Sequence, residues 1–262
     1  NDLYLHFEVV PDNLPDKLKA VLQQFPEHAL QFEIGVQSFD EDIQMLISRK
    51  QNNDRSRDNL RWLREHTHAY IHADLIFGLP GDTLENFAHS FDALYALAPH
   101  EIQLGILKRL RGVPLNRHND DYDMRFNPEP PYNILSTRDI DFLTMQRVNR
   151  FARFWDMTAN SGRFKNSLPL ILADQPFEHF LALSDWLYQQ CGSTWKIALR
   201  RLFVLLNQYV EQHDDIDSRS WLQRLAMDYE RSGEKASFDK LLATKKVNTT
   251  PVANKRQRSV MQ

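Results

Sequence analysis

Four polar side chains stand at the ends of three predicted strands, where they could bind a ligand. They are Glu8, Gln37, Ser38 and Asp74. The carboxyl ends of parallel strands meet on one side of a sheet, so these groups would surround one mouth. Asp74 lies in an apolar strand, where a carboxyl group is costly to bury unless it is hydrogen-bonded, for example to a ligand hydroxyl. The cluster predicts a ligand site. A local hydrogen bond at Asp74 and an ordinary turn at residues 78–81 would explain the same residues equally well.

Alternating strand and helix patterns must position these groups. Strands are predicted at residues 3–10, 31–36, 69–77 and 102–107, and the segments between them carry apolar residues at helical spacing. Thr83 suits the amino-terminal cap of one such helix. Repeated strand-helix units predict an α/β fold with a parallel sheet. Four units are too few for a complete eight-stranded barrel, and periodicity alone does not decide whether the sheet closes.

The pattern changes after residue 107. Residues 108–131 are rich in charge, asparagine and proline, which is typical of a linker or an active-site loop. Helical periodicity returns at residues 136–156, 176–190, 194–212 and 218–231. We therefore predict an α/β domain at residues 1–118 and an all-α domain at residues 119–243. Residues 244–262 are basic and contain no acid, and we expect a disordered tail there.

Composition excludes several classes of protein. The chain has 262 residues, 42% of them hydrophobic, and a formal net charge of −3, which allows a sizeable core and does not favour nucleic acid as a partner. No apolar run reaches the ~20 residues of a membrane span. The one cysteine, Cys191, excludes an internal disulfide and a multi-cysteine metal site, and it suits a reducing cytoplasm. Because Asn1 leads directly into a strand pattern, we expect a truncated amino terminus.

Two further clusters have a functional and a structural explanation. His66, His68 and His72 are close in sequence, but no carboxylate or cysteine accompanies them at ligand spacing, so exposed or capping histidines are expected rather than a metal site. The arginine and aromatic residues between positions 150 and 163 would suit a pocket for a planar, carboxylate-bearing substrate. Packing at a helix end explains them equally well.

Three motifs in this order resemble the radical S-adenosylmethionine (SAM) superfamily. They are Glu8-Val9-Val10-Pro11, Ile34-Gly35-Val36-Gln37-Ser38-Phe39-Asp40 and Asp74-Leu75-Ile76-Phe77-Gly78-Leu79-Pro80-Gly81-Asp82-Thr83. The set is most similar to the group with anaerobic coproporphyrinogen dehydrogenase and to the cobalamin-dependent enzymes, and residues 102–115 resemble the cobalamin-dependent set. The resemblance covers residues 1–118. It implies a partial (β/α) radical SAM barrel, strands three to six of six. Residues 153–164 resemble a helical domain of unknown function that follows such barrels.

The resemblance also implies which residues bind SAM. Carboxylate and amide side chains would contact its ribose hydroxyls or ammonium, arginine would suit its carboxylate, and the ends of the third and fourth strands would lie against adenine. The implied cofactor-binding residues are Glu8, Gln37, Ser38, Arg49, Asp74, Ile76, Gly78, Leu107 and Lys108. No catalytic or metal-binding residue is implied.

The chain departs from the superfamily in ways that limit this implication. The three cysteines that hold the iron-sulfur cluster are absent, as is the glycine-rich strand that binds the SAM amino group. The third motif has aspartate where many members have glycine, and Gly81 where many have glutamate. Both of these changes are shared with the coproporphyrinogen-type group.

We therefore expect the carboxy-terminal part of a radical SAM enzyme that is inactive by itself. The complete enzyme would use SAM, an iron-sulfur cluster, a small-molecule substrate and a reductant protein such as flavodoxin or ferredoxin, with cobalamin on a separate amino-terminal domain as an option. One alternative is a cobalamin-independent, coproporphyrinogen-type oxidoreductase. Another is a cluster-free module that binds SAM or a partner without catalysis.

Overall fold

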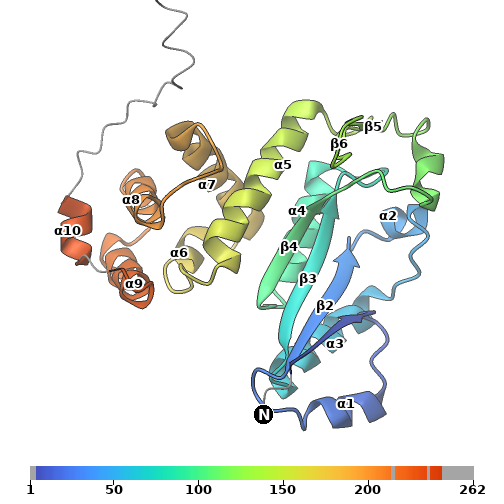
Figure 1. Ribbon diagram of the computed structural model, residues 1–262, viewed down its shortest axis with the longest axis horizontal. Coiled ribbons are helices and arrows are strands. Elements are labelled where there is room, and N and C mark those ends of the chain that lie inside the picture. Colours follow the sequence, from blue (N-terminus) through green and yellow to red (C-terminus); the bar gives the residue numbers. More distant parts are fainter. Residues whose placement is uncertain (1–3, 214–215, 235–236, 244–262) are drawn as a thin grey trace, which may run out of the picture.

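Four parallel strands form the amino-terminal half of the protein (Figure 1). The computed structural model describes residues 4–213, 216–234 and 237–243. Strands β1 (Leu5–Val9), β2 (Leu30–Gln37), β3 (Tyr70–Phe77) and β4 (Glu101–Ile106) lie in the order β1-β2-β3-β4. Helices α1 (Asp16–Leu22), α2 (Glu41–Leu46), α3 (Asn53–His66) and α4 (Leu84–Tyr95) connect them. The predicted α/β fold with four strand-helix units is confirmed.

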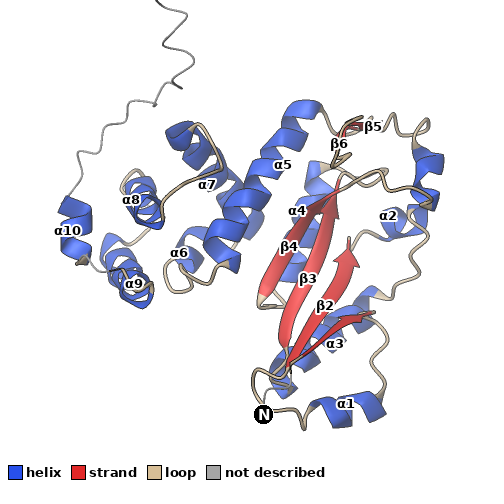
Figure 2. Cartoon of the chain, in the orientation of Figure 1, coloured by secondary structure: helices blue, strands red, loops and turns tan. Residues whose placement is uncertain are grey.

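The two faces of this sheet differ because side chains alternate along each strand. In β2, Leu30, Phe32, Ile34 and Val36 are buried, whereas the residues between them are only partly buried. Helices α3 and α4 lie behind the sheet in Figure 2 and cover the apolar face. The other face, called the open face below, carries the alternate residues of all four strands, including those of β3 from Tyr70 to Ile76.

Side-chain caps fix where several helices begin. Asp40 accepts a hydrogen bond from Ile43 N at the start of α2, and Thr83 accepts one from Asn86 N at the start of α4. Each cap pairs one of the backbone N–H groups that the first helical turn leaves free. The predicted cap at Thr83 is therefore confirmed, and these helices begin at the carboxyl ends of β2 and β3.

Residues 107–136 are folded back over the carboxyl ends of the strands. They contain the short 3₁₀ helix η1 (Pro114–His118) and the antiparallel strands β5 (Arg125–Phe126) and β6 (Ile134–Ser136). Leu107 N donates to Phe77 O and Ile134 N donates to Leu107 O, so β6 is attached directly to the end of the sheet. Lys108 and Asn133 form a further antiparallel bridge. The segment behaves as a covering loop of the sheet rather than as a free linker.

Helices form the remainder of the described chain. They are α5 (Phe142–Trp155), the π-helical turn η2 (Asp156–Asn160), α6 (Leu168–Leu172), α7 (Pro176–Cys191), α8 (Leu199–Val210), α9 (Ser218–Arg231) and α10 (Phe238–Ala243). The ring of Phe91 on α4 contacts the rings of Phe151, Trp155 and Phe177. One hydrophobic core thus runs from the sheet into the helices. A domain boundary at residue 118 remains a prediction, and the predicted tail at residues 244–262 lies outside the described residues.

The outer edge of β4 is occupied by a side chain. Asn160 accepts from Ile102 N through Oδ1 at 3.1 Å and donates to Ile102 O through Nδ2 at 3.0 Å. The amide therefore makes the two hydrogen bonds that a neighbouring strand would make at this residue.

Among the helices that the structure describes, none is long and apolar enough to cross a membrane.

Candidate functional site

Asp74 carries an unpaired carboxylate oxygen on the open face. In the sheet it lies opposite Gly35 on one side and Gln103 on the other. Its Oδ1 is buried and has no hydrogen-bond partner. Burial, with smaller contributions from Glu33 and Glu8, raises the pKa of Asp74 from 3.8 to about 6. A buried acceptor without a donor is costly, so this oxygen can accept a hydrogen bond from a ligand hydroxyl or ammonium.

Gln37 presents a second unpaired oxygen at the end of β2. Its backbone has φ 69°, and the pairing of β2 with β3 shifts register between Gly35 and Gln37. Ser38 N donates to Val36 O across this residue, which makes a tight three-residue turn. The Gln37 Oε1 atom is buried without a partner. Strained residues of this kind concentrate at functional sites, which supports a ligand near the Gln37 amide.

Gly35 and Arg49 complete the end of β2. A Cβ at Gly35 would lie 2.6 Å from Gln37 Nε2, so a residue with a side chain would displace that amide. Arg49 donates to Gly35 O through Nη2 and to Gln51 Oε1 through Nε at 2.8 Å. Burial lowers the pKa of Arg49, and Asp12 partly offsets this effect. Gly35, Gln37 and Arg49 therefore lie together. Gln37 and Arg49 are two of the residues that the resemblance implied for SAM binding.

An apolar pocket lies beyond the ends of β3 and β4. It has a volume of about 270 Å³, and Ile76, Leu107 and Lys108 are among its lining residues. The segment from residue 107 to 118 forms its outer wall, because Arg117 on η1 donates to Leu46 O at the end of α2 and to Ser48 Oγ just after it. Leu107 is buried and Lys108 is exposed at the rim. A pocket with this lining suits a flat, mostly apolar group.

Gly78 shapes the turn after β3. It has φ 88°, and a Cβ there would lie 2.8 Å from Ile134 Cγ2, so only glycine fits. Its N–H donates to Asp82 Oδ2 at 3.3 Å, and Thr83 N donates to Asp82 Oδ1 at 3.0 Å. Burial raises the pKa of Asp82 to about 7, although these two backbone N–H groups act in the opposite direction. Asp82 thus stabilises the turn at Gly78 through these two hydrogen bonds. The only sequence signal for this role of Asp82 was its position in the third motif.

Two of the predicted residues differ from Gln37 and Asp74 in their surroundings. Glu8 is exposed on β1, beside Glu33 of β2. The Ser38 hydroxyl is buried, where it lies 3.5 Å from Ser90 Oγ on α4 and accepts from Asp40 N at 3.1 Å. The structure therefore brings Gln37, Arg49 and Asp74 to one region, whereas the Ser38 side chain serves the covered side of the sheet.

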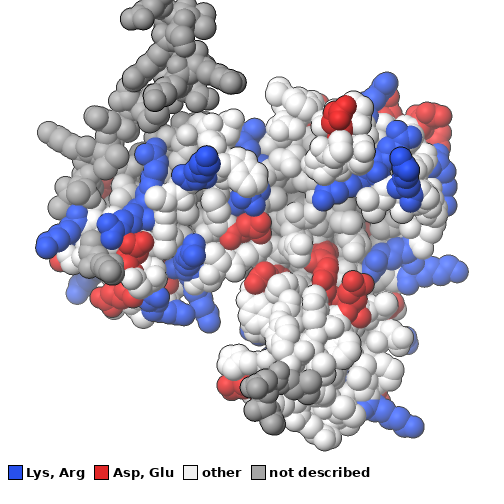
Figure 3. Space-filling model, in the orientation of Figure 1, with Lys and Arg blue, Asp and Glu red and all other residues white. Residues whose placement is uncertain are grey.

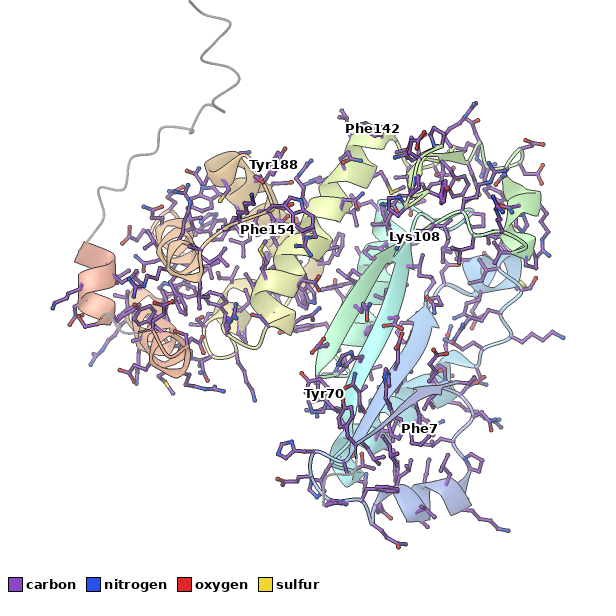
Figure 4. The ribbon with its side chains drawn as sticks, viewed as in Figure 1. Phe7, Tyr70, Lys108, Phe142, Phe154 and Tyr188 are labelled. Carbon is purple, nitrogen blue, oxygen red and sulfur yellow. The ribbon has the colours of Figure 1, made fainter. Side chains whose placement is uncertain are left out.

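Sequence reasoning missed the acidic character of the whole open face. Glu33 pairs with His6 at 3.4 Å, and Glu101 pairs with His72 at 3.5 Å. Figure 3 shows acidic side chains gathered over the strands that face the viewer. In Figure 4, Tyr70 marks the amino end of this face and Lys108 its carboxyl end. Strand alternation could have found Glu33, which precedes Gly35 by two positions and so shares its face.

The chain does not supply the ligands of an iron-sulfur cluster. Such clusters are held mainly by cysteine thiolates, and the sequence contains only Cys191, which lies at the end of α7. Across residues 4–213, 216–234 and 237–243, no group of three or more His, Cys, Asp or Glu side chains could hold a metal ion. Cluster ligands would therefore have to come from outside this sequence.

Two family models match the chain. One, described as the radical SAM superfamily, matches residues 2–94. The other, described as a protein of unknown function (DUF4080), matches residues 120–261, which is more than half of the chain. The chain therefore belongs to the DUF4080 family, and its amino-terminal part belongs to the radical SAM superfamily.

Curated relatives match the amino-terminal part. The oxygen-independent coproporphyrinogen III oxidase of Pseudomonas aeruginosa is 33% identical over 90 residues, which cover 34% of this chain and 20% of the relative. The enzyme of the same name from Paracoccus denitrificans is 35% identical over 71 residues, or 27% of this chain and 16% of the relative. The coproporphyrinogen-III oxidase-like protein HemZ of Bacillus subtilis is 26% identical over 112 residues, or 43% and 22%. The chain thus spans about a fifth of the length of these relatives.

Two solved structures show a partial likeness. Coproporphyrinogen III oxidase (HemN) from Escherichia coli aligns with a TM-score of 0.44 at 21% identity, over 60% of this chain and 32% of that chain. The radical SAM methyltransferase TsrM from Kitasatospora setae aligns with a TM-score of 0.42 at 15% identity, over 50% of this chain and 26% of that chain.

Proposed function

We propose that residues 1–118 form the SAM-binding wall of a radical SAM enzyme. The observation that carries this proposal is the pair of buried, unpaired oxygens, Gln37 Oε1 and Asp74 Oδ1, within the part of the chain that matches the radical SAM model. Both lie toward the carboxyl ends of neighbouring parallel strands, where ligands of α/β proteins bind. A polar ligand at this position would supply the missing donors.

Each residue of the site then has a separate role in binding SAM. Gln37 and Asp74 would accept hydrogen bonds from the ribose hydroxyls or the ammonium group. Arg49, already placed against Gly35 O, would attract the carboxylate. Ile76 and Leu107 would cover adenine in the apolar pocket, and Gly78 would keep the turn after β3 beside that pocket. These side chains bind and orient SAM without any chemistry of their own.

The complete protein would cleave SAM reductively and pass a hydrogen-abstracting radical to a small-molecule substrate. The cluster and a reductant protein such as flavodoxin or ferredoxin would supply the electron from outside this sequence. A coproporphyrinogen-type reaction is the first candidate, because coproporphyrinogen III oxidases are 33% and 35% identical over their matched segments. A cobalamin-assisted reaction is the second, because residues 102–115 resemble the cobalamin-dependent set. Cobalamin content of the complete protein distinguishes the two.

Calorimetric titration of the chain with SAM tests the binding proposal. We expect saturable binding that weakens at least tenfold in Asp74→Ala and in Gln37→Ala, since each change removes an acceptor that the folded chain leaves unpaired. Glu101→Gln is the matched control, because Glu101 is an acid of the same face at the opposite end of the sheet, where Tyr70 and His72 contact it. Affinity that is equal in all variants, or absent in the wild-type chain, would refute the proposal.

Catalysis is tested on the complete reading frame. After anaerobic reconstitution of the cluster, SAM and a reductant should yield 5′-deoxyadenosine from the full frame and none from this chain alone. A full frame that contains no cysteine triad and forms no product would overturn the catalytic proposal. If SAM still bound to the chain, the cluster-free binding module would be the remaining function.

A further inference from the structure

A second pocket lies in the helical part of the protein, apart from the open face. It has a volume of about 490 Å³ and is lined by the segment before β6, by α5, and by the end of α7 with the loop that follows. This volume lies within the range of small-molecule sites. In Figure 4 the label of Tyr188 marks its α7 side, where α7 ends beside α5.

Two arginines on α5 give this pocket a fixed cationic wall. The guanidinium of Arg150 lies 4.6 Å from the centre of the Tyr188 ring, and that of Arg153 lies 4.1 Å from the Trp195 ring. Stacking on an aromatic face holds a guanidinium in place while its edge stays able to donate hydrogen bonds to an oxyanion. The two side chains remain 27% and 39% exposed, so neither is enclosed by the core.

These arginines lack strong acceptors among the described residues. The Nε atoms of Arg150 and Arg153 are buried without a hydrogen-bond partner. Asp185 bonds closely to Arg147 at 2.6 Å, but its nearest oxygen lies 4.0 Å from Arg150 Nη2. Asp156 lies 3.6 Å from Arg153 Nη1. Both longer distances exceed the range of a hydrogen bond, so packing at a helix end does not satisfy the two guanidinium groups.

The rest of the lining favours an anion with an attached flat or apolar group. No acidic residue lines the pocket, which otherwise contains amide and hydroxyl side chains such as Asn133 and Asn149. The Asn133 Oδ1 atom is buried and unpaired. Trp195 is 66% exposed on the loop after α7, so much of its side chain remains accessible to a ligand. Guanidinium donors beside an exposed indole ring match a ligand that has one anionic end and an attached flat or apolar group.

We propose that this pocket binds a small molecule that carries a carboxylate or phosphate on a planar or apolar body. Arg150 and Arg153 would hold the oxyanion, and Trp195 would cover the body. The site does not depend on SAM binding, although the bridge between Lys108 and Asn133 connects its wall to the rim of the apolar pocket at the sheet.

Fluorine NMR of the full 262-residue chain tests this proposal. The reporter is 4-(trifluoromethyl)benzoate, and the competitors are benzoate, phenyl phosphate, inorganic phosphate and neutral benzamide. We expect saturable broadening of the reporter, displacement by benzoate or phenyl phosphate, and none by benzamide. The stronger of the two anionic competitors identifies the preferred group, and displacement by inorganic phosphate indicates that the anion alone suffices.

Variants distinguish binding in this pocket from nonspecific attraction of the anion to positive charge elsewhere on the protein. Arg150→Gln and Arg153→Gln should each weaken reporter binding about tenfold, because each removes a charge-assisted donor. Arg224→Gln is the matched control, since Arg224 is an exposed arginine on α9 outside the pocket lining. Trp195→Ala changes an exposed loop residue and so tests the site without loss of folding. It should weaken binding of the aryl reporter more than binding of inorganic phosphate. The proposal fails if no anion binds saturably, or if the arginine variants bind the reporter as the wild type does.

Discussion

The two faces of the four-stranded sheet are formed by the same strands but differ in chemistry: one is apolar and buried, and the other carries polar and acidic side chains. On the covered face of β2, every second residue is apolar and buried, and it contacts the helices behind the sheet. On the open face, the same strands carry the acidic residues Glu33, Asp74 and Glu101. Buried apolar area stabilises the fold, whereas unpaired polar atoms reduce its stability and provide binding. The comparison predicts that changes on the covered side affect unfolding and that changes on the open side affect ligand affinity.

The largest effect is expected behind the sheet. Phe91→Ala should lower the free energy of unfolding by about 3–5 kcal/mol, since it removes a fully buried ring that joins α4 to α5 and α7. Denaturant unfolding followed by circular dichroism measures the change. Phe142→Ala is the matched control, because Phe142 is 51% exposed, and its cost should stay below about 1 kcal/mol. Equal losses in both variants would contradict the role given to the covered side.

The second effect is a dependence of stability on pH that originates at Asp74. Because burial raises the pKa of Asp74 from 3.8 to about 6, the folded chain keeps a proton that the unfolded chain has released between these values. Stability should therefore fall as pH rises from about 4 to about 6 and level off above. Partial exposure to solvent limits the effect to about 1–2 kcal/mol. Unfolding free energies of the wild type and Asp74→Asn across this range should differ in slope, and parallel curves would exclude an ionisable, buried Asp74.

A smaller effect should link Gly35 to Gln37. Gly35→Ala places a Cβ 2.6 Å from Gln37 Nε2 and should move the amide, with a several-fold loss of SAM affinity and a change in stability below about 1 kcal/mol. In a Gln37→Ala background the same substitution should have no further effect on affinity, because the group that it displaces is gone. Additive losses in this double-mutant cycle would mean that Gly35 acts independently of Gln37.

The smallest effect on binding is expected at Ser38. Ser38→Ala should cost about 1 kcal/mol of stability, since its hydroxyl accepts from Asp40 N and lies beside Ser90. SAM affinity should remain that of the wild type. A loss of affinity without a loss of stability would return Ser38 to the ligand site and weaken the contrast between the two faces.

Local patterns predicted the elements of the fold well. The strand predicted at residues 31–36 is Leu30–Gln37, and the helix predicted at 218–231 is Ser218–Arg231. The helix predicted from residue 194 begins only at Leu199, because the preceding loop includes Lys196 with φ 57°. The apolar repeat of a strand or helix involves residues that are close in sequence, so their spacing alone can predict the element.

The site was only partly predictable for the same reason. Strand ends and motif resemblance indicated Gln37 and Asp74, whose orphaned oxygens now support that prediction. The bond from Arg49 to Gly35 O and the contact of Ile134 with Gly78 join segments that are separated in the chain. Contacts of this kind depend on tertiary packing and leave no periodic signal. The direction of the Ser38 hydroxyl likewise depends on Ser90, which belongs to another strand-helix unit.

The side-chain amide of Asn160 blocks one edge of the sheet, at Ile102 on β4. By bonding to both Ile102 N and Ile102 O, it occupies the β4 edge in the way a neighbouring strand would, and an occupied edge resists pairing with other chains. At the opposite edge, within the described residues, β1 pairs only with β2 and leaves Tyr4, Phe7 and Val10 exposed. Within the described residues, a further strand therefore finds an open sheet edge at β1, whereas Asn160 blocks the β4 edge at Ile102.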